Sequence, residues 1–569
     1  MNVFSQTPEH RFEETQELPA LEVGQFADDA GEAERSPVPS IARNAIIVGI
    51  AFILSRILGV VREIAIAAQF GTSADYDAYV AAFRIPDLLF LIVMSGAFGS
   101  AFIPVFAGFI ARRDERGAWR LASAVLSITL VVLIATSLLV LAFAGPLVSW
   151  IIAPGLDTQQ KILAVDLTRL LLLSPLLLGL GIAFKGILEA QERFALAAFA
   201  PVFYNAGIIF GAVALTGRFG IFGLALGVIL GAGLHAGIQF AGLLRGRIWL
   251  EWLPSINVPG IRTVGGLMAP RVIGQAAFQV NFIVMTNFAS RLSASSVGAL
   301  NYAFQLFMLP YGVLALSLST VIFPRLSRQF ELGQLDDMKL TLSRALSPLI
   351  FLSLPAAIGL LTYRQSIVQV LFEIGSFDAE STNLVAGALA YFSLGLLGWA
   401  LIEALTRAFY AMQDTRTPVT ISVSAVVLNV LLSWLLSREM GYRGLALALS
   451  IASTVEALAL VVMLQIRIGI ISRDLVSRSL RSVLAGSLFL PYAIWTGQLL
   501  ADATDPAAGR TIGTYLLFTY GLGTAVAVFA TIAFLVGVRD IQEIGLRIPV
   551  VRRYLRPFLT ARYGPESTG

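Results

Sequence analysis

Long uncharged apolar runs of about 20 residues recur along almost the whole chain, from residue 42 to residue 537. A helix of that length is about 30 Å long, which matches the hydrocarbon core of a bilayer. The runs are continuous and do not alternate apolar with polar positions, so they predict helices and not the strands of a membrane barrel. Helices also satisfy their own backbone hydrogen bonds in lipid. The pattern therefore predicts an all-α polytopic membrane protein.

The apolar runs divide into about 14 predicted transmembrane helices. We expect two groups of six helices, with two more helices after the second group. The predicted spans are residues 42–68, 78–110, 119–149, 163–187, 196–216, 220–244, 264–289, 297–324, 340–362, 383–410, 418–437, 443–466, 480–500 and 511–537.

The two groups of six spans repeat each other at a separation of roughly 220 residues. Phe102-Ile-Pro104 matches Ile322-Phe-Pro324, and Gly223-Leu-Ala-Leu226 matches Gly444-Leu-Ala-Leu447. Six spans return the chain to the side on which it started, so the halves are expected to be parallel repeats about an axis along the membrane normal. Many transporters that alternate access are built in this way, with the substrate between the two lobes.

The repeat also predicts a domain organisation. We expect an N-terminal lobe over residues 42–246, a C-terminal lobe over residues 260–468, and two further helices within residues 477–537. The acidic, polar residues 1–41 are typical of a disordered tail. Residues 538–569 form a basic tail, which can contact anionic lipid headgroups.

Basic residues set the expected orientation of the chain. The loops after even-numbered spans, counted together with the adjoining span ends, hold 19 Lys and Arg residues, Lys185 among them, and the loops after odd-numbered spans counted in the same way hold seven. Loops rich in Lys and Arg stay in the cytoplasm, so the even loops and both termini are predicted to be cytoplasmic. The composition agrees with a membrane protein, because 57% of the residues are hydrophobic, 13% are charged and the mean hydropathy is +0.80.

Charged residues inside the predicted spans are the first candidates for a functional site, because a charge at membrane depth usually faces a cavity or a partner. The first span carries Arg56 and Arg62, and the second carries Asp77 and Arg84. A guanidinium can bind two phosphate oxygens at once, so arginines clustered in a cavity suit a pyrophosphate. The alternative is structural, with Arg62 beside Glu63 near a helix end and Asp77 paired with Arg84.

The spans of the second group carry mostly neutral polar residues. Gln305 lies in the eighth span, and Arg271 lies near the start of the seventh. Hydrogen bonds between helices explain most such amides. Glu403 and Arg407 share a helix face at i, i+4 spacing and can simply pair. Glu456 is a candidate for coupling transport to a proton or another cation.

No motif of a hydrolase, of a phosphate-binding loop or of a zinc site occurs in the chain, so we expect neither an enzyme nor a bound cofactor. The absence of cysteine excludes disulfides and thiolate metal sites. Transport would then draw on an ion gradient or on the membrane potential. The expected partners are the transported substrate, membrane lipids and a coupling cation, with no nucleic acid.

Four segments form a recognisable set: Ser55-Arg-Ile-Leu-Gly-Val-Val-Arg62, Asp77-Ala-Tyr-Val-Ala-Ala-Phe-Arg-Ile-Pro86, Gly96-Ala-Phe-Gly-Ser-Ala-Phe-Ile-Pro104 and Arg407-Ala-Phe-Tyr-Ala-Met-Gln-Asp-Thr-Arg-Thr-Pro418. Together they resemble the MurJ (MviN) family of lipid II flippases in the MOP superfamily. The resemblance implies fourteen helices around a V-shaped cavity, in the bacterial cytoplasmic membrane. It also implies export of lipid II, the undecaprenyl-pyrophosphate-linked peptidoglycan precursor.

Several charges typical of that family are missing here. Phe90 and Leu91 stand where basic residues are common, Ser95 stands where a glutamate is common, and Phe304-Gln305 replaces an Asp-Arg pair. Either Arg271 and Arg407 supply the charge from other helices, or the substrate differs. The resulting candidate substrate-binding residues are Arg56, Arg62, Asp77, Arg84, Arg271, Gln305 and Arg407.

The first hypothesis is a lipid II flippase that alternates access, in which Arg56, Arg62 and Arg84 hold the pyrophosphate and Asp77 orients or releases them. Within the same superfamily, the alternatives are a flippase for another polyprenyl-linked glycan and a cation-coupled drug exporter. A membrane scaffold that no longer transports belongs to a different class. A membrane glycosyltransferase is disfavoured, because no large extracytoplasmic loop carries candidate catalytic carboxylates.

Overall fold

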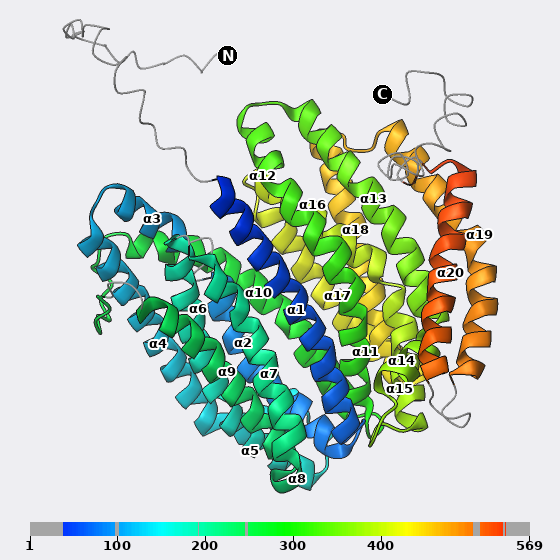
Figure 1. The fold of residues 1–569 in the computed structure, drawn as a ribbon, viewed down its shortest axis with the longest axis horizontal. Helices are drawn as coiled ribbons and strands as arrows, with labels where there is room; N and C mark the ends of the chain where they lie inside the picture. The colour runs from blue at the N-terminus through cyan, green and yellow to red at the C-terminus, as the bar shows by residue number, and fades with distance from the viewer. Residues whose placement is uncertain are drawn as a thin grey trace, which may run out of the picture.

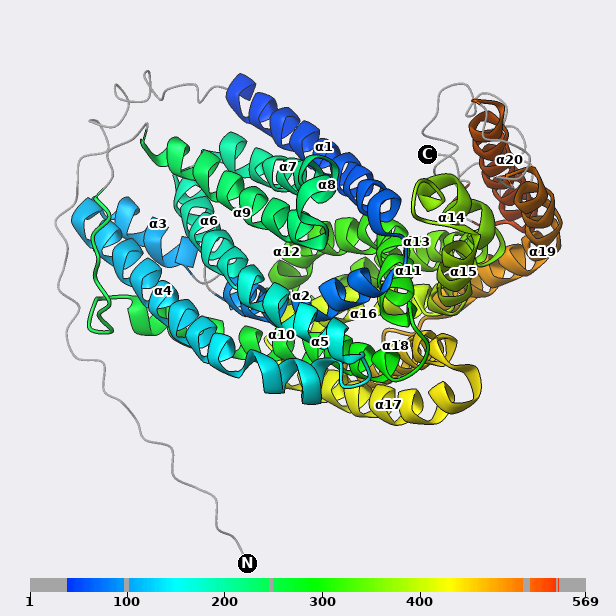
Figure 2. The same ribbon diagram turned by 90° about the horizontal axis from the view of Figure 1, so that it is seen from below.

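The computed structural model describes residues 38–96, 102–191, 193–244, 249–504, 512–538 and 541. Among these residues the chain forms long helices, and no strand occurs. Figure 1 shows two packed groups of helices, and Figure 2 shows the same groups side by side from below. The predicted all-helical membrane fold is confirmed.

The first lobe comprises the helices up to residue 244. They are α1 (Val38–Phe70), α2 (Ala74–Gly96), α3 (Ile103–Ala111), α4 (Glu115–Pro146), α5 (Thr158–Leu171), α6 (Leu173–Ala190), α7 (Phe194–Phe210), α8 (Thr216–Phe219) and α9 (Ile221–Leu244). Short π-helical turns, Leu147–Ile152 and Gly211–Leu215, continue α4 and α7. At the start of α5, Asp157 and Gln160 satisfy each other's backbone N–H groups in a capping box.

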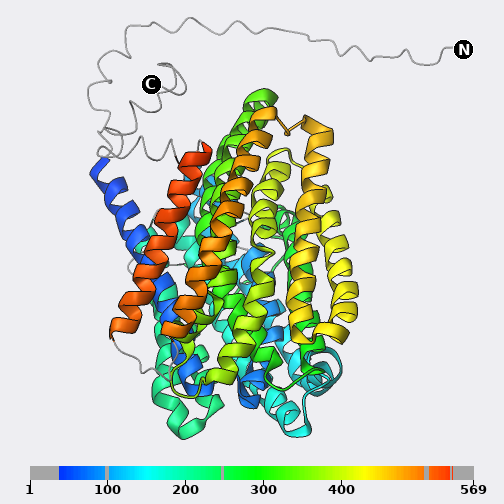
Figure 3. The same ribbon diagram turned by 90° about the vertical axis from the view of Figure 1, so that its right-hand side faces the viewer.

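The second lobe comprises α10 (Ile261–Ser290), α11 (Ser296–Tyr311), α12 (Ser317–Glu331), α13 (Leu335–Thr362), α14 (Arg364–Phe372), α15 (Ala379–Ser393), α16 (Leu396–Ala411), α17 (Arg416–Met440) and α18 (Tyr442–Ile468). A π-helical turn, Gly312–Leu316, joins α11 to α12. At the edge of this lobe α19 (Arg473–Ala503) packs on α13, and α20 (Ile512–Val536) packs on α19 (Figure 3).

Each predicted span falls on a helix or on consecutive helices. In the described part of the chain, ten helices or continuous helix runs are long and apolar enough to cross a membrane, and the bent pair α15–α16 would make eleven. The spans predicted on α1, on α2 with α3, and on α10 are not among them. Five of the seven candidate site residues, Arg56, Arg62, Asp77, Arg84 and Arg271, lie on these helices. The total of fourteen spans stays a prediction.

The backbone reproduces the sequence repeat. Gly220 and Gly441 both adopt φ near +60°, at the turns that lead into α9 and α18. Three residues later, Gly223 and Gly444 pack against the preceding helix so closely that a Cβ on either would lie within 2.6 Å of its backbone. Only glycine tolerates both features at little cost. The internal repeat is therefore also a repeat of local structure.

The two ends of the bundle differ in charge and in packing. At the basic face, the turn from α3 to α4 carries Arg112 and Arg113, and the adjoining helix ends carry Arg116 on α4 and Arg325 and Arg328 on α12. At the opposite end, where α1 ends and α2 begins, the two lobes contact each other directly, and we call this end the sealed face. A core of buried aromatic rings lies just inside it, where Tyr76 stacks on Tyr302 with the ring centroids 4.6 Å apart.

The expected domain boundaries agree approximately with the helix ends. Helix α1 begins at Val38, four residues before the expected start of the first lobe at residue 42. The predicted tails lie almost entirely outside the described residues. The domain limits, and the side of the membrane on which each tail lies, stay predictions.

Candidate functional site

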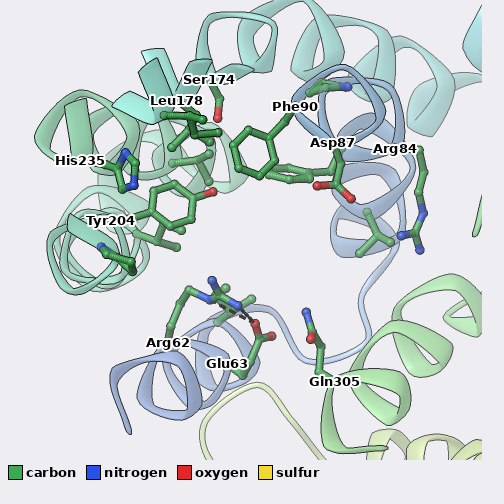
Figure 4. A pocket seen from close by; sticks show the side chains of 18 of the residues that line it. Arg62, Glu63, Arg84, Asp87, Phe90, Ser174, Leu178, Tyr204, His235 and Gln305 are labelled. Atoms are coloured by element: carbon green, nitrogen blue, oxygen red, sulfur yellow. Dashed lines mark hydrogen bonds and ion pairs between the residues drawn. The ribbon is translucent and has the colours of Figure 1, made fainter. Parts of the chain in front are cut away.

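A cavity of about 560 Å³ lies between the lobes. Ligand pockets in proteins commonly enclose about 300–1,000 Å³, so the space suits a sizeable ligand. Helices α1, α2, α6, α7 and α9 of the first lobe line it, together with α11 of the second lobe. Figure 4 shows polar side chains from both lobes around this space. Its charged and imidazole side chains belong to Arg62, Glu63, Arg84, Asp87, Lys185, Glu189 and His235.

Backbone contacts between the lobes close the sealed face. The N–H of Ser376, before α15, donates to the carbonyl of Ala68, near the end of α1, over 2.8 Å. Gly71 and Gly375 permit this approach, because both have positive φ and neither carries a Cβ. A Cβ on Gly375 would lie 2.3 Å from the Ala68 carbonyl oxygen. On the other side of the bundle, the N–H of Gly155 donates to Ser290 at the end of α10.

Side chains extend this closure. The hydroxyls of Thr72 and Ser381 lie 2.9 Å apart. Asp378 accepts a hydrogen bond from the N–H of Ser381 at the start of α15, and this backbone donor lowers the pKa of Asp378. Asn301 donates to the hydroxyl of Tyr76 over 3.1 Å. The contacts join α1 and α2 to α11, α14 and α15, so the cavity has no wide opening at this end.

Asp77, a candidate for contact with substrate, belongs to the closure. Its carboxylate is buried and accepts a hydrogen bond from the N–H of Gly298 over 2.7 Å. Gly298 is the third residue of α11, where backbone N–H groups lack partners within the helix. Asp77 therefore caps a helix of the other lobe. The alternative pairing of Asp77 with Arg84 is not what the structure shows, because Arg84 donates to Thr286.

Arg62 lies at the centre of the cavity wall formed by α1 (Figure 4). Its Nε and Nη2 both donate to Glu63 Oε1, over 3.1 and 2.5 Å, and its Nη1 donates to Asn205 Oδ1 over 3.0 Å. Three hydrogen bonds fix the guanidinium, and the neighbouring carboxylate neutralises it. The structural pairing of Arg62 with Glu63 is thus real, but the pair faces the cavity.

Arg84 and Asp87 line the cavity from α2, and both are tied to α10 of the second lobe. Arg84 Nε donates to Thr286 over 2.8 Å, and its guanidinium lies 5.6 Å from the ring centroid of Phe282. Gln279 donates to Asp87 over 2.8 Å. This wall therefore also carries a cation and an anion, each held by a neutral polar group.

Arg56 lies outside the described cavity lining. Two turns of α1 separate it from Arg62, so it is about 9 Å nearer the basic face. Its side chain is exposed, stacks on Phe52 and extends to the π-helical turn of the second lobe, where a Cβ on Gly312 would lie 3.3 Å from its Nη1. Arg56 therefore lies at the boundary between the lobes.

The second lobe contributes neutral side chains to the site. Among the described lining residues, Asn301 and Gln305 come from this lobe. Phe304 instead packs in a cluster with Phe282 and Trp399. Phe90 does line the cavity, and the charge missing at that position is therefore missing from the site itself.

Of the two arginines expected to compensate, Arg407 does not supply that charge in the described structure. Arg407 donates twice to Glu403 on its own helix, over 3.0 and 2.6 Å, and is absent from the described lining. For Arg271 and Ser95 the structure describes the backbone helix but not the side chain. Glu456 accepts a hydrogen bond from Ser422 within the second lobe.

Sequence reasoning missed a set of polar lining residues on α6 and α9. It assigned Lys185 to a loop, but Lys185 lies within α6 and lines the cavity. Glu189, one turn further along, and His235 on α9 line it too. The i, i+4 spacing of Lys185 and Glu189 inside an apolar span was the signal that could have found them.

A model of the family described as "Lipid II flippase MurJ" matches residues 66–503 of the chain. The chain is 32% identical over 535 residues to a probable lipid II flippase MurJ of Rhizobium tropici, an alignment that covers 91% of this chain and 97% of the relative. It is 33% identical over 420 residues to the lipid II flippase MurJ of Burkholderia cenocepacia, which covers 72% of this chain and 80% of the relative.

Two solved structures share the fold. One is a lipid II flippase MurJ in an inward closed conformation, with a TM-score of 0.70 and 22% identity over 88% of this chain and 99% of that one. The other is an inward-facing multidrug resistance transporter of the MATE family in the MOP superfamily, with a TM-score of 0.63 and 16% identity over 75% of this chain and 98% of that one. At these identities the likeness concerns the fold.

Proposed function

The chain belongs to the family of MurJ lipid II flippases, and on this premise we propose that it moves lipid II across the bacterial cytoplasmic membrane by alternating access. The observation that carries the proposal is the cavity between the two repeats. It holds charged side chains at the depth of the apolar spans, and interlobe contacts close it at one end. Charges at such depth mark a transport path.

In this proposal the pyrophosphate of lipid II binds near Arg62 and Arg84. Both residues line the cavity, one from α1 and one from α2, and a guanidinium can offer paired N–H groups to phosphate oxygens. In the substrate-free protein, Glu63 accepts the hydrogen bonds that Arg62 would otherwise donate to the pyrophosphate. A bound pyrophosphate would replace this carboxylate, and Glu63 would take Arg62 back on release.

Asp77 serves the conformational cycle in the proposal. It holds the start of α11 against α2 at the sealed face, so that opening this face requires the hydrogen bond to Gly298 to break. Arg56, at the lobe boundary, would contact substrate as it moves between the basic face and Arg62. Gln305 would contribute a neutral hydrogen-bonding group.

The orientation follows from the loop charges. We place the basic face in the cytoplasm, because positively charged loops are retained there. The sealed face is then extracytoplasmic, and the cavity is accessible from the side on which lipid II is made. A coupling cation remains part of the proposal, with Glu456 as its candidate group. The family consists of transporters, and we propose no catalytic step.

Reconstitution tests the proposal directly. The purified protein is placed in vesicles that contain fluorescent lipid II, and the fraction accessible to a membrane-impermeant quencher is followed. We expect accessibility to rise above the half found in protein-free vesicles. In parallel, the gene is expressed in cells depleted of their own flippase. Failure to raise lipid II in the outer leaflet in both assays contradicts the proposal.

A cation-coupled drug exporter is the second candidate, and the likeness to a MATE transporter favours it. The same vesicles separate the two. An exporter accumulates a cationic dye against a proton or sodium gradient and leaves lipid II where it was. A flippase moves lipid II between the leaflets and does not accumulate the dye.

A further inference from the structure

The part of the cavity nearest the basic face holds an ion pair that the proposed pyrophosphate site does not use. Lys185 and Glu189 lie on one face of α6, with Lys185 Nζ 3.6 Å from Glu189 Oε1. His235 of α9 also lines the cavity but lies deeper, with its ring 6.4 Å from that of Tyr204. We call Lys185 and Glu189 the mouth cluster.

The mouth cluster is separated in depth from Arg62. Residues 191–193 join α6 to α7 at the basic face, so depth can be counted from this turn. Lys185 lies five residues before the end of α6, about 8 Å deep, whereas Asn205, which holds Arg62, lies eleven residues into α7, about 16 Å deep. A separation of roughly 8 Å along the bundle axis is more than one pyrophosphate spans.

The Lys185–Glu189 pair is poorly explained as a support for α6. Lys before Glu at i, i+4 is the less favourable order on a helix. Glu189 also lies in the last turn, where the helix dipole disfavours a negative charge. Side-chain exposures of 46% and 27% leave both groups accessible to the cavity, and exposed pairs of this kind contribute little stability.

Lys185 also differs from Arg62 in how tightly it is held. Three hydrogen bonds of 3.1 Å or less fix the guanidinium of Arg62. The 3.6 Å approach of Lys185 to Glu189 is longer than a hydrogen bond, and a lysine ammonium sits on a flexible four-carbon chain. Lys185 can therefore leave Glu189 for an arriving anion at small cost.

We infer that the mouth cluster is a second binding pole, at which Lys185 binds a carboxylate of the peptide carried by the substrate while the arginines hold its pyrophosphate. This inference rests on the proposed function, because it presumes a headgroup with two separated anionic groups. It makes Lys185 a determinant of specificity. A polyprenyl-pyrophosphate lipid without peptide would use only the arginines.

A cycle of two proteins and two ligands tests the inference. Binding is measured for the full-length wild type and for Lys185→Gln, with lipid II and with lipid II whose peptide carboxylates are amidated. We expect the wild type to prefer the free carboxylates about tenfold, the size of one charge-assisted hydrogen bond, and Lys185→Gln to lose that preference. Undecaprenyl pyrophosphate, which has no peptide, should bind both proteins equally.

Two further variants keep the test independent of folding. Glu189→Gln removes the competing carboxylate and should tighten lipid II binding, whereas Lys185→Arg should keep the preference. Lys339→Gln is the matched control, because Lys339 pairs with Asp336 at the basic face, away from the cavity. Its binding should equal that of the wild type.

Each outcome decides one question. Equal preference in the wild type and in Lys185→Gln overturns the second pole. Parallel loss of undecaprenyl pyrophosphate binding in Lys185→Gln also overturns it, because the lysine would then serve the pyrophosphate. A wild type that binds none of the three lipids contradicts the proposed function instead.

Discussion

The two lobes share one backbone plan but differ in what they present to the cavity. Helices α1 and α10 both end at the sealed face, and eight residues before these ends stand Arg62 in the first lobe and Phe282 in the second. Likewise, α2 carries Arg84 and Asp87, three residues apart, whereas α11 carries Phe304 and Phe307 at the same spacing. One lobe is charged where the other is aromatic.

The difference separates two tasks. The first lobe supplies the charged groups that suit an anionic headgroup, and the phenylalanines of the second lobe pack on one another and on Trp399. Such a packed aromatic cluster is stiff, because protein interiors are close-packed. We interpret the second lobe as the rigid wall against which the charged lobe moves. The shared sealed face is where the two lobes hold each other.

The largest effect is expected from locking that face. The Thr72 and Ser381 hydroxyls lie 2.9 Å apart on different lobes, and the chain has no cysteine of its own. Thr72→Cys with Ser381→Cys should form a disulfide on oxidation and abolish lipid II transport, and a reductant should restore it. Vesicle transport with and without reductant measures this. Each single cysteine variant is the control, and a locked protein that still transports contradicts alternating access.

The next prediction compares the loss of affinity on replacing one arginine from each lobe. Arg62→Gln should lower lipid II affinity about tenfold to 100-fold, because it removes charge-assisted hydrogen bonds to the pyrophosphate. Arg407→Gln should change it less than about threefold, since Arg407 is paired with Glu403 outside the described lining. Binding of lipid II to the two variants and to the wild type measures both. Equal losses would mean that the lobes do not divide their tasks.

The sequence predicts the fold well because apolar periodicity and repeats are local signals. The matched segments Gly223-Leu-Ala-Leu226 and Gly444-Leu-Ala-Leu447 each follow a glycine with positive φ in the structure, Gly220 and Gly441. Arg62 and Arg84 are also predictable, because a charge inside an apolar span needs an explanation. For the number of spans the sequence predicts about 14, whereas ten or eleven described helices qualify by length and composition, and α1, α2 with α3, and α10 are not among them.

Tertiary partners are what the sequence does not provide. Asp77 reads as a substrate ligand from its place in a span, yet its carboxylate caps α11 from 221 residues away. Lys185 reads as a loop residue because it lies near a helix end, yet it lines the cavity. Both assignments depend on which helices pack together, which periodicity within one helix does not encode.

A smaller effect is expected from adding a cation to the neutral lobe. Gln305 lines the cavity from α11, so Gln305→Arg would give the second lobe a charge like that of the first. We expect undecaprenyl pyrophosphate to bind about threefold to tenfold tighter and transport to slow, because release becomes harder. Gln365→Arg, at an exposed site on α14, is the control. Unchanged affinity would show that substrate does not reach α11.

The last prediction concerns the packing behind the mouth cluster, and it is read out as stability and not as binding. In the first lobe, Gly181 on α6 makes room for His235, and a Cβ there would lie 2.5 Å from His235 Nδ1. The second lobe has Glu456 at the same distance from the start of its helix, hydrogen-bonded to Ser422. Gly181→Ala should therefore strain only the first lobe. We expect the free energy of unfolding to fall by about 1–3 kcal/mol, and with it the midpoint of thermal unfolding in detergent.

The matched control for this packing effect is Gly237→Ala on α9, because nothing lies within 4 Å of a Cβ at that position. Alanine is a better helix former than glycine by about 0.8–1.0 kcal/mol, so this variant should be as stable as the wild type or slightly more so. If Gly181→Ala instead unfolds at the same temperature as Gly237→Ala, the imidazole moves freely within the cavity. His235 would then be an adjustable wall of the cavity, and the first lobe would be soft where the second is packed.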